Sequence, residues 1–267
     1  MKKLLLLSFI GITLFSCSSD DATDSTGETD VNFPLPLNNG NYWTYDVVGN
    51  GTTTRDSLYI SGDTLITSNT YKKFKTKDNV ATGFYSSSLR NNGVRQSNQL
   101  LLMSGDFSFG QGQALPVGLD LSLNDFIIFK KNANNGDILS TKSGNFNQTV
   151  NNIPLTIEYT LKSVGGQTLS TFTSPNGDNY TDIKTTKIIV NLKVTTTQVV
   201  AGVPFTITLL QPQDVVTSTQ YIAKNIGVVY TNTLTTYSID AAVAGQLGIP
   251  ASTTQTQEEF LDTYNVN

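Results

Sequence analysis

The sequence has no histidine and a single cysteine, and charged residues make up only 14% of its 267 positions. The lack of histidine removes Ser-His-Asp and Cys-His catalysis, the imidazole general base and nearly all zinc sites. With one cysteine, no disulfide within the chain can frame the fold, so an apolar core must hold it. There is no basic stripe of the kind that binds nucleic acid, which is therefore excluded as a partner. We expect no cofactor.

Long apolar runs are also scarce, apart from one at the start of the chain. Met1-Lys2-Lys3 precedes an apolar stretch from Leu4 to Phe15, and Ser16 and Cys17 follow it. A basic start, a short apolar core and a small residue are the parts of an export signal. A helix that spans a bilayer needs about 20 apolar residues, so this run is too short for a permanent anchor. The pattern predicts a signal peptide over residues 1–16.

Residues 14–17, Leu-Phe-Ser-Cys, resemble the lipobox of bacterial lipoproteins. The resemblance implies that the chain is cut before Cys17 and that acyl chains such as palmitate are attached to this residue. The membrane is then one partner of the protein, reached through the lipid anchor. Stable anchoring needs more than one chain, because each buried CH₂ contributes only about 0.8 kcal/mol.

The residues after Cys17 resemble the short acidic export signal of Bacteroidota surface lipoproteins. They are Ser18, Ser19, Asp20 and Asp21. The resemblance implies an outer-membrane lipoprotein that faces the cell exterior. The alternative is a periplasmic face, because a lipoprotein tether is often polar and acidic in any case. Residues 17–33 are polar with almost nothing apolar, which predicts a disordered acidic tether.

Residues 34–267 form one predicted domain rich in Thr, Val, Ile, Tyr and Asn, which favour strands and turns. Alternating apolar positions and frequent Asn-Gly pairs predict an antiparallel all-β domain. About ten strands would form a strongly curved sheet, either a half-barrel or barrel or a sandwich. One short helix is expected near 240–247, capped by Asp240 and ended by Gly248. Residues 253–264 are ambiguous, and their threonines favour a strand over a helix.

An internal duplication is the second feature of this domain. Repeat A covers about 38–125 and repeat B about 134–267, with four short echoes in the same order. Insertions in the second copy belong in loops and hairpins, so the residues between Lys184 and Asn225 should form a protruding hairpin. Such a hairpin is the best candidate for a partner-facing element. The echoes pair Gly40 with Gly136, Gly62 with Gly166 (both expected in turns), Tyr71 with Tyr180, and Gly93 with Gly227.

Two segments resemble the early and late parts of a family of Bacteroidota surface lipoproteins. The first is residues 36–45, where Pro-Leu and a glycine precede Trp-x-Tyr, and the second is residues 221–230, where Ala-Lys precedes Gly-x-Val. Proteins of this appearance are similar in outline to half-barrel lipoprotein carriers. The resemblance implies a β-rich fold and, being fold-level analogy, no particular activity.

Few residues stand out as candidates for chemistry. Trp43, the one tryptophan, is expected in the core. Residues 176–179 with Asp182 carry oxygen ligands that suit calcium, but their spacing matches no full calcium loop and fits a plain turn. We therefore predict no metal site. A glycosidase needs two facing carboxylates, and no spacing singles out a pair. The carboxylates considered are Asp56, Asp63, Asp125 and Glu158.

Three positions match the O-glycosylation motif of Bacteroidota exported proteins, namely Ser25, Ser57 and Thr64. For the domain as a whole we expect a non-enzymatic role, with no catalytic residues, in binding an unknown protein, glycan or lipid ligand or in envelope structure. The second hypothesis is a carrier that shelters an acyl chain or other apolar ligand in the curved sheet. The third is an aspartate-dependent hydrolase. A hollow apolar interior would favour the carrier, a filled core the first hypothesis, and two converging buried carboxylates the hydrolase.

Overall fold

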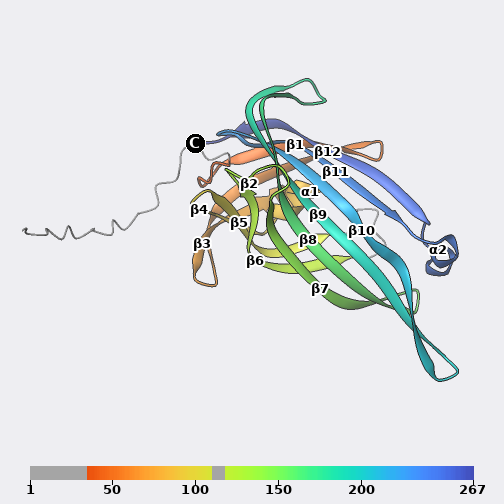
Figure 1. Cartoon of the computed structure of the whole chain (residues 1–267). Coiled ribbons are helices and arrows are strands. Elements are labelled where there is room, and N and C mark those ends of the chain that lie inside the picture. The colour runs from red at the N-terminus through yellow and green to blue at the C-terminus, as the bar shows by residue number, and fades with distance from the viewer. Residues whose placement is uncertain (1–34, 110–117) are drawn as a thin grey trace, which may run out of the picture.

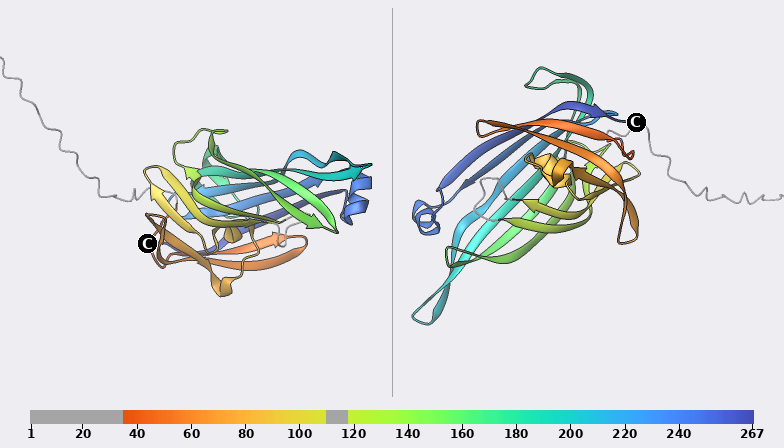
Figure 2. Two further views of the ribbon diagram at one scale, coloured as in Figure 1. Left: turned by 90° about the horizontal axis from the view of Figure 1, so that it is seen from below. Right: turned by 180° about the vertical axis from the view of Figure 1, so that it is seen from behind.

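The computed structural model describes residues 35–109 and 118–267, which form one antiparallel sheet of twelve strands. The sheet curls into a nearly closed barrel (Figures 1 and 2). This confirms the predicted all-β class and its barrel form. The predicted signal peptide (1–16), the predicted tether (17–33) and Cys17, the predicted site of lipid attachment, lie outside the described residues.

The strands follow one another around the barrel in chain order, and β1 pairs with β12. Two short helices interrupt the meander. α1 lies between β3 and β4, and α2 lies between β11 and β12. The first six strands are β1 (Tyr42–Gly49), β2 (Thr52–Ile66), β3 (Asn69–Thr76), β4 (Gly93–Ser97), β5 (Leu100–Phe109) and β6 (Leu119–Lys130), with a 3-10 turn, Lys77–Asn79, before α1 (Phe84–Leu89). The last six are β7 (Ile138–Val150), β8 (Ile153–Thr173), β9 (Asn179–Val200), β10 (Val203–Ala223), β11 (Gly227–Ser238) and β12 (Ser252–Asn265), with α2 (Ala241–Leu247) before β12.

The barrel closes through side chains where β6 meets the second half of the sheet. No ladder of backbone hydrogen bonds joins β6 to β7 in the described chain. Instead, the backbone N–H of Ile127 donates to Ser140 Oγ at 3.0 Å, and the hydroxyl of Ser163 donates to the carbonyl of Ile127. Thr186 Oγ1 donates to the carbonyl of Ile128 at 3.2 Å. Hydroxyls of three strands therefore pair with the backbone of Ile127 and Ile128 on the free edge of β6.

The interior is largely filled. Trp43 is 1% exposed and its indole N–H donates to the carbonyl of Ile226 at 2.6 Å, which confirms its predicted place in the core. The loop that carries α1 packs against the sheet from inside, with Phe84 edge-on to Phe107 and Tyr85 edge-on to Tyr45. The core therefore includes a helix that the sequence analysis did not anticipate. The predicted helix at 240–247 is present as α2, and residues 253–264 are confirmed as part of strand β12.

Three of the four echoes occupy equivalent places in the two halves of the barrel. Gly40 lies in the turn before β1 and Gly136 in the corresponding turn before β7, with φ of +87° and +92°. Gly62 and Gly166 lie on β2 and β8, each where the pairing register shifts. Their predicted location in turns is wrong: both mark β-bulges within strands, where an extra residue bends the strand. Tyr71 and Tyr180 lie on β3 and β9.

The fourth echo does not fit the duplication. Gly93 begins β4, the fourth strand of the first half, whereas Gly227 begins β11, the fifth strand of the second half. These strands run in opposite directions relative to β3 and β9, so the two glycines cannot superpose with the rest. Each half also has six strands, where five were expected. The predicted long hairpin does exist. β9 and β10 pair along their length, from Ile183 opposite Ala223 to Val200 opposite Val203.

Candidate functional site

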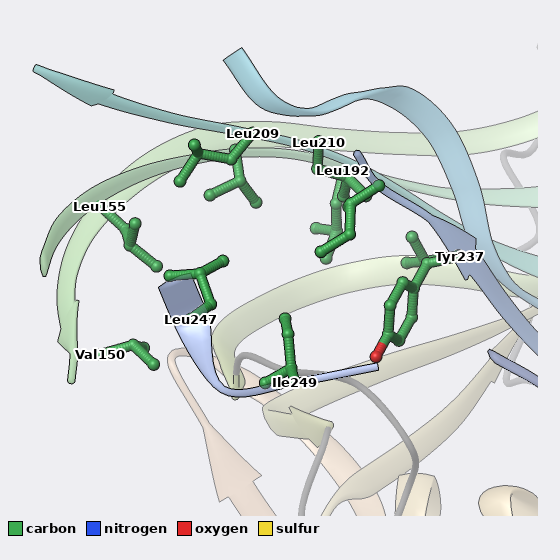
Figure 3. A pocket seen from close by; sticks show the side chains of 11 residues that line it. Val150, Leu155, Leu192, Leu209, Leu210, Tyr237, Leu247 and Ile249 are labelled. Atoms are coloured by element: carbon green, nitrogen blue, oxygen red, sulfur yellow. The ribbon is translucent and has the colours of Figure 1, made fainter. Parts of the chain in front are cut away.

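An apolar hollow lies at the end of the barrel that α2 covers (Figure 3). Its walls come from β8 to β11 and the end of β7, and its cover is α2 with the two residues that follow it. Tyr237 is the one lining side chain with a polar atom, and burial raises its pKa. The lining residues are Val150, Leu155, Leu192, Val194, Leu209, Leu210, Val215, Tyr237, Ile239, Leu247 and Ile249.

The hollow is almost closed in this conformation. It measures about 450 Å³ when the part open to solvent is included, but the free space inside is about 20 Å³. This space suits about one water molecule, whereas ligand pockets measure roughly 300–1,000 Å³. A ligand of useful size could therefore enter only if α2 moved outward.

Local sequence explains why α2 forms and where it ends. The Asp240 carboxylate accepts the backbone N–H of Ala242 at 2.8 Å and caps the first turn. Gly248, at φ +65°, ends the helix in the left-handed conformation. Beyond these caps, one polar contact ties the helix to the far wall: Asn151 Nδ2 in the β7–β8 turn donates to the carbonyl of Leu247 at 2.6 Å. The helix thus covers the hollow, with its first turn capped by Asp240 and its last turn bonded to Asn151.

A second, polar hollow opens at the same end, beside the first. Its free volume is about 260 Å³, and it is lined by hydroxyl and amide side chains without any charged group. Thr235 lines this hollow and Tyr237, two residues along β11, lines the apolar one. The lining residues are Val47, Gly49, Asn50, Thr52, Thr54, Ala81, Thr82, Thr235, Gln255, Thr256 and Gln257.

Two buried carboxylates converge behind the polar hollow. Asp56 is 1% exposed and Glu259 is 0% exposed, and they face the loop that carries α1. Asp56 accepts the backbone N–H groups of Thr82 and Gly83, at 3.0 and 2.8 Å. Glu259 accepts those of Tyr85 and Ser86, at 2.7 and 3.3 Å. Desolvation raises the pKa of Glu259 to about 7, with the charge of Asp56 adding to the shift.

Both carboxylates are buried and near each other, but their oxygens accept hydrogen bonds from the protein backbone. Gln257 extends the set, since its Oε1 accepts the backbone N–H of Phe84 at 2.8 Å. Together the three side chains satisfy successive N–H groups of the inner loop, which would otherwise be buried without partners. We therefore assign them a structural role: they fix α1 inside the barrel.

The other carboxylates considered from the sequence are separate from this pair. Asp125 binds Arg95 through two hydrogen bonds of 2.8 and 2.7 Å, and Arg95 lowers its pKa. Asp63 pairs with Lys72 at 2.5 Å and Glu158 with Lys193 at 2.8 Å, both on the surface. Of the four carboxylates considered, only Asp56 lies near a second buried carboxylate, that of Glu259. Glu259 was not among the candidates from the sequence.

The remaining candidates from the sequence are the possible calcium loop and the three O-glycosylation positions. Residues 176–179 form a turn whose side chains bind one another, as in the 2.9 Å bond from Asn176 Nδ2 to Asp178 Oδ2. Within residues 35–109 and 118–267, no group of three or more His, Cys, Asp or Glu side chains could hold a metal ion. Ser57 and Thr64 are half-buried on β2, so O-glycosylation there stays a prediction. Ser25 and residues 17–21 lie outside the described residues.

No helix in the described part of the chain is long and apolar enough to cross a membrane.

The chain matches no family model and no curated protein sequence. Among solved structures it is similar to a candidate lipoprotein from Parabacteroides distasonis ATCC 8503, at 11% sequence identity and a TM-score of 0.34. The similarity covers 88% of this chain and 99% of that one. A likeness of this degree assigns no function to this chain.

Proposed function

We propose that the protein is a lipid-anchored, non-catalytic carrier of the bacterial cell envelope. In the described part of the chain, the core around Trp43 and α1 is filled and leaves no room for a ligand, so the proposed site is confined to the apolar end of the barrel. There an acyl chain, or a molecule of similar chemistry, binds beneath α2 once that helix has moved outward. The observation that carries this proposal is the lining of that hollow: of its eleven side chains, which include Leu247 of α2 and Ile249 after it, only Tyr237 has a polar atom. An all-apolar wall favours a ligand that offers no hydrogen bonds.

The energetics of the cover fit a carrier that opens and closes. Moving α2 outward breaks the bond from Asn151 to Leu247 and exposes the buried side chains of Ala244 and Leu247. Exposing a leucine costs about 1.5–3 kcal/mol and losing a hydrogen bond about 1 kcal/mol. Burying each CH₂ of a ligand returns about 0.8 kcal/mol, so a chain of about ten carbons outweighs the cost of opening.

The envelope location rests on the resemblance of residues 14–21 to a lipobox and a surface-export signal. Under this proposal Cys17 bears the acyl chains, and the domain lies at the outer membrane and faces the cell exterior. The non-catalytic character is supported by the carboxylate pair, because Asp56 and Glu259 are engaged by backbone N–H groups of residues 82–86.

The polar hollow supports a second candidate ligand, a small uncharged polar molecule such as part of a glycan. The favouring observation is its free volume of about 260 Å³ with threonine and glutamine side chains around it. Hydroxyl and amide groups both donate and accept hydrogen bonds, which suits a ligand with hydroxyl groups. Binding there would need no movement of α2, and this distinguishes it from the first candidate.

The carrier proposal can be tested by locking α2 shut. A Cβ placed on Gly248 lies 3.2 Å from Asn151 Nδ2, so Asn151→Cys with Gly248→Cys should form a disulfide between the cover and the far wall. The background is the mature chain from residue 17 with Cys17→Ser, which is then free of other thiols. Binding of dansylundecanoate is followed by fluorescence. The parent protein should bind with a dissociation constant on the order of 10 μM. The reduced double variant, which lacks the bond from Asn151 to Leu247, should bind at least as tightly.

Oxidation should lower binding by about tenfold or more, and reduction of the same sample should restore it. The matched control, Ile138→Cys with Leu65→Cys, places two thiols on exposed strand positions far from α2 and should respond to neither treatment. Absence of saturable binding by the parent protein would refute the proposal. Equal binding by the locked and reduced forms would show that the ligand does not enter beneath α2.

A further inference from the structure

The hairpin of β9 and β10 extends well beyond the barrel (Figures 1 and 2). β8 pairs with β9 only as far as Thr195, and β11 pairs with β10 only from Val216 onward. Residues 197–207 therefore pair within the hairpin alone and leave both of its edges free. The hairpin ends in a tight turn at Ala201 and Gly202, with φ of +51° and +82°. This outer part is called the hairpin tip below.

The hairpin tip is apolar and carries no charge. The sequence has no charged residue between Lys193 and Asp214. Every side chain described in residues 197–207 is exposed, among them Val199 at 68% and Phe205 at 53%. Soluble proteins usually protect a free strand edge with charged side chains, often lysine, because a bare apolar edge pairs with other chains. A long uncharged tip with exposed apolar side chains is therefore typical of a surface that is covered by another apolar phase or molecule.

The strand pairing arranges the tip in two faces. Val203, Phe205 and Ile207 alternate along β10 and share one face, and Val199 and Pro204 form a pair on the other. Leu209, the next odd position of β10, lines the hollow beneath α2. The exposed apolar stripe thus runs from the turn of the hairpin to the mouth of the apolar hollow.

We propose that the hairpin tip inserts into the interfacial layer of a lipid bilayer. A protein partner is oriented by complementary charges and polar groups, and the tip offers no charge for such pairing. A bilayer accepts aliphatic and aromatic side chains without specific partners, and it is the surface to which Cys17 is proposed to hold the chain. Insertion of the tip does not depend on the anchor or on the hollow, and it is tested without either.

The length of the chain allows both attachments to one membrane. Leu35 lies beside Gly227, at the end of β10 opposite to the hairpin tip. β10 has 21 residues and spans about 70 Å at the usual rise per strand residue. The residues between Cys17 and Leu35 reach at most about 60 Å when extended. A barrel lying along the membrane could therefore touch it with the tip while its other end stays anchored.

The test is flotation of the mature chain from residue 17, carrying Cys17→Ser, with vesicles of phosphatidylethanolamine and phosphatidylglycerol. The tip variant is Val199→Thr with Phe205→Thr and Ile207→Thr, because threonine keeps the strand preference and removes the apolar surface. The matched control is Leu65→Thr with Val80→Thr and Ile138→Thr, three apolar side chains elsewhere that are 59–71% exposed, against 39–68% for those of the tip variant. The tip variant should partition roughly tenfold less than the parent or lower still, and the control should match the parent.

A second measurement reports the depth of the tip. A nitrobenzoxadiazole dye on Phe205→Cys should shift to the blue with vesicles and be quenched by spin-labelled lipid, while the same dye on Asn176→Cys, in the β8–β9 turn, should stay in water. If the dye at 205 also stays in water, the proposal is wrong. If sedimentation without vesicles shows that the parent forms dimers and the tip variant does not, the tip joins two copies of the chain and the membrane assignment falls. Dansylundecanoate binding is scored separately, so failure of one proposal leaves the other measurable.

Discussion

At the scale of single residues, Gly83 shows how closely the inner loop fits the barrel wall. Its φ is −72°, which any residue adopts, but an added Cβ would lie 2.1 Å from Glu259 Oε2. Gly83→Ala must therefore displace a buried carboxylate, and we expect the free energy of unfolding to fall by about 2–4 kcal/mol. Gly245→Ala in α2 is the control, because its Cβ meets nothing within 4 Å. Urea denaturation measures both, and equal stabilities of the two variants would contradict this packing.

Glu259 should make stability depend on pH. Its pKa rises from 4.5 to about 7 in the folded protein because burial disfavours the carboxylate. The folded state therefore holds a proton that the unfolded state releases above about pH 4.5, and this stabilisation is full below that pH and is lost as pH rises through 7. The loss should be on the order of 3 kcal/mol.

Glu259→Gln keeps the shape of the side chain and removes this titration. As pH rises from 5 to 8, the parent should lose on the order of 3 kcal/mol of unfolding free energy relative to the variant, measured by urea denaturation at each pH. A difference that stays constant over this range would mean that Glu259 does not titrate there, and that its burial affects stability without a proton being taken up.

At the scale of elements, α2 and α1 show what local sequence can predict. α2 was predicted because its signals lie within ten residues, from the Asp240 cap to Gly248. α1 has the sequence Phe-Tyr-Ser-Ser-Ser-Leu, which has low helix propensity. The N–H groups of its first turn bind Gln257 and Glu259, and those of the two residues before it bind Asp56, all far away in the sequence. No local pattern contains those partners, so the helix could not be predicted from the sequence.

The candidate site was predictable only in part, for the same reason. Glu258 and Glu259 are adjacent, and on a strand with one buried face, one of two neighbouring side chains must point inward. This signal could have identified Glu259. The hollow beneath α2 has no such signal, because its walls combine strands β7 to β11 and depend on how the barrel closes. The long β9–β10 hairpin was predicted from the extra residues between Lys184 and Asn225 in the second repeat.

The cap of α2 allows a prediction about the cover. Asp240→Ala removes the acceptor for the N–H groups of Ala242 and Val243 and should destabilise α2 by about 1 kcal/mol. Amides of residues 241–247 should then exchange about fivefold faster, and dansylundecanoate should associate faster, while global stability changes little. Asp240→Asn keeps an acceptor and should resemble the parent. Unchanged exchange in Asp240→Ala would mean that the cap does not hold the cover.

At the scale of the whole molecule, the proposed anchor predicts the fate of one variant. Cys17→Ser removes the only thiol of the chain. We expect the precursor to stay uncut before residue 17 and to carry no acyl chains, because the lipobox resemblance assigns both steps to this cysteine. Membrane fractionation and intact mass measure the result. Normal cleavage with full membrane retention would contradict the lipoprotein assignment.

Orientation at the membrane is tested by residues 18–21. If they direct surface display, proteinase K added to intact cells should degrade the parent protein and spare the variant Asp20→Ala with Asp21→Ala. Lysed cells serve as the control, in which both proteins should be degraded. Equal protection of both proteins in intact cells would assign the domain to the periplasmic face.

The pairing of β1 with β12 has a consequence for how the protein acquires its fold. Tyr42 pairs with Asn265, so the first strand finds one of its two neighbours only when the last strand is available. Such contacts raise the contact order and close the largest loop in the chain, which slows folding. The early strands must wait with an unpaired edge until the carboxyl end is available. If the chain is exported as proposed, the two halves of the sheet are joined only after translocation, and a chaperone that shields β1 in the interval would protect the protein from aggregation.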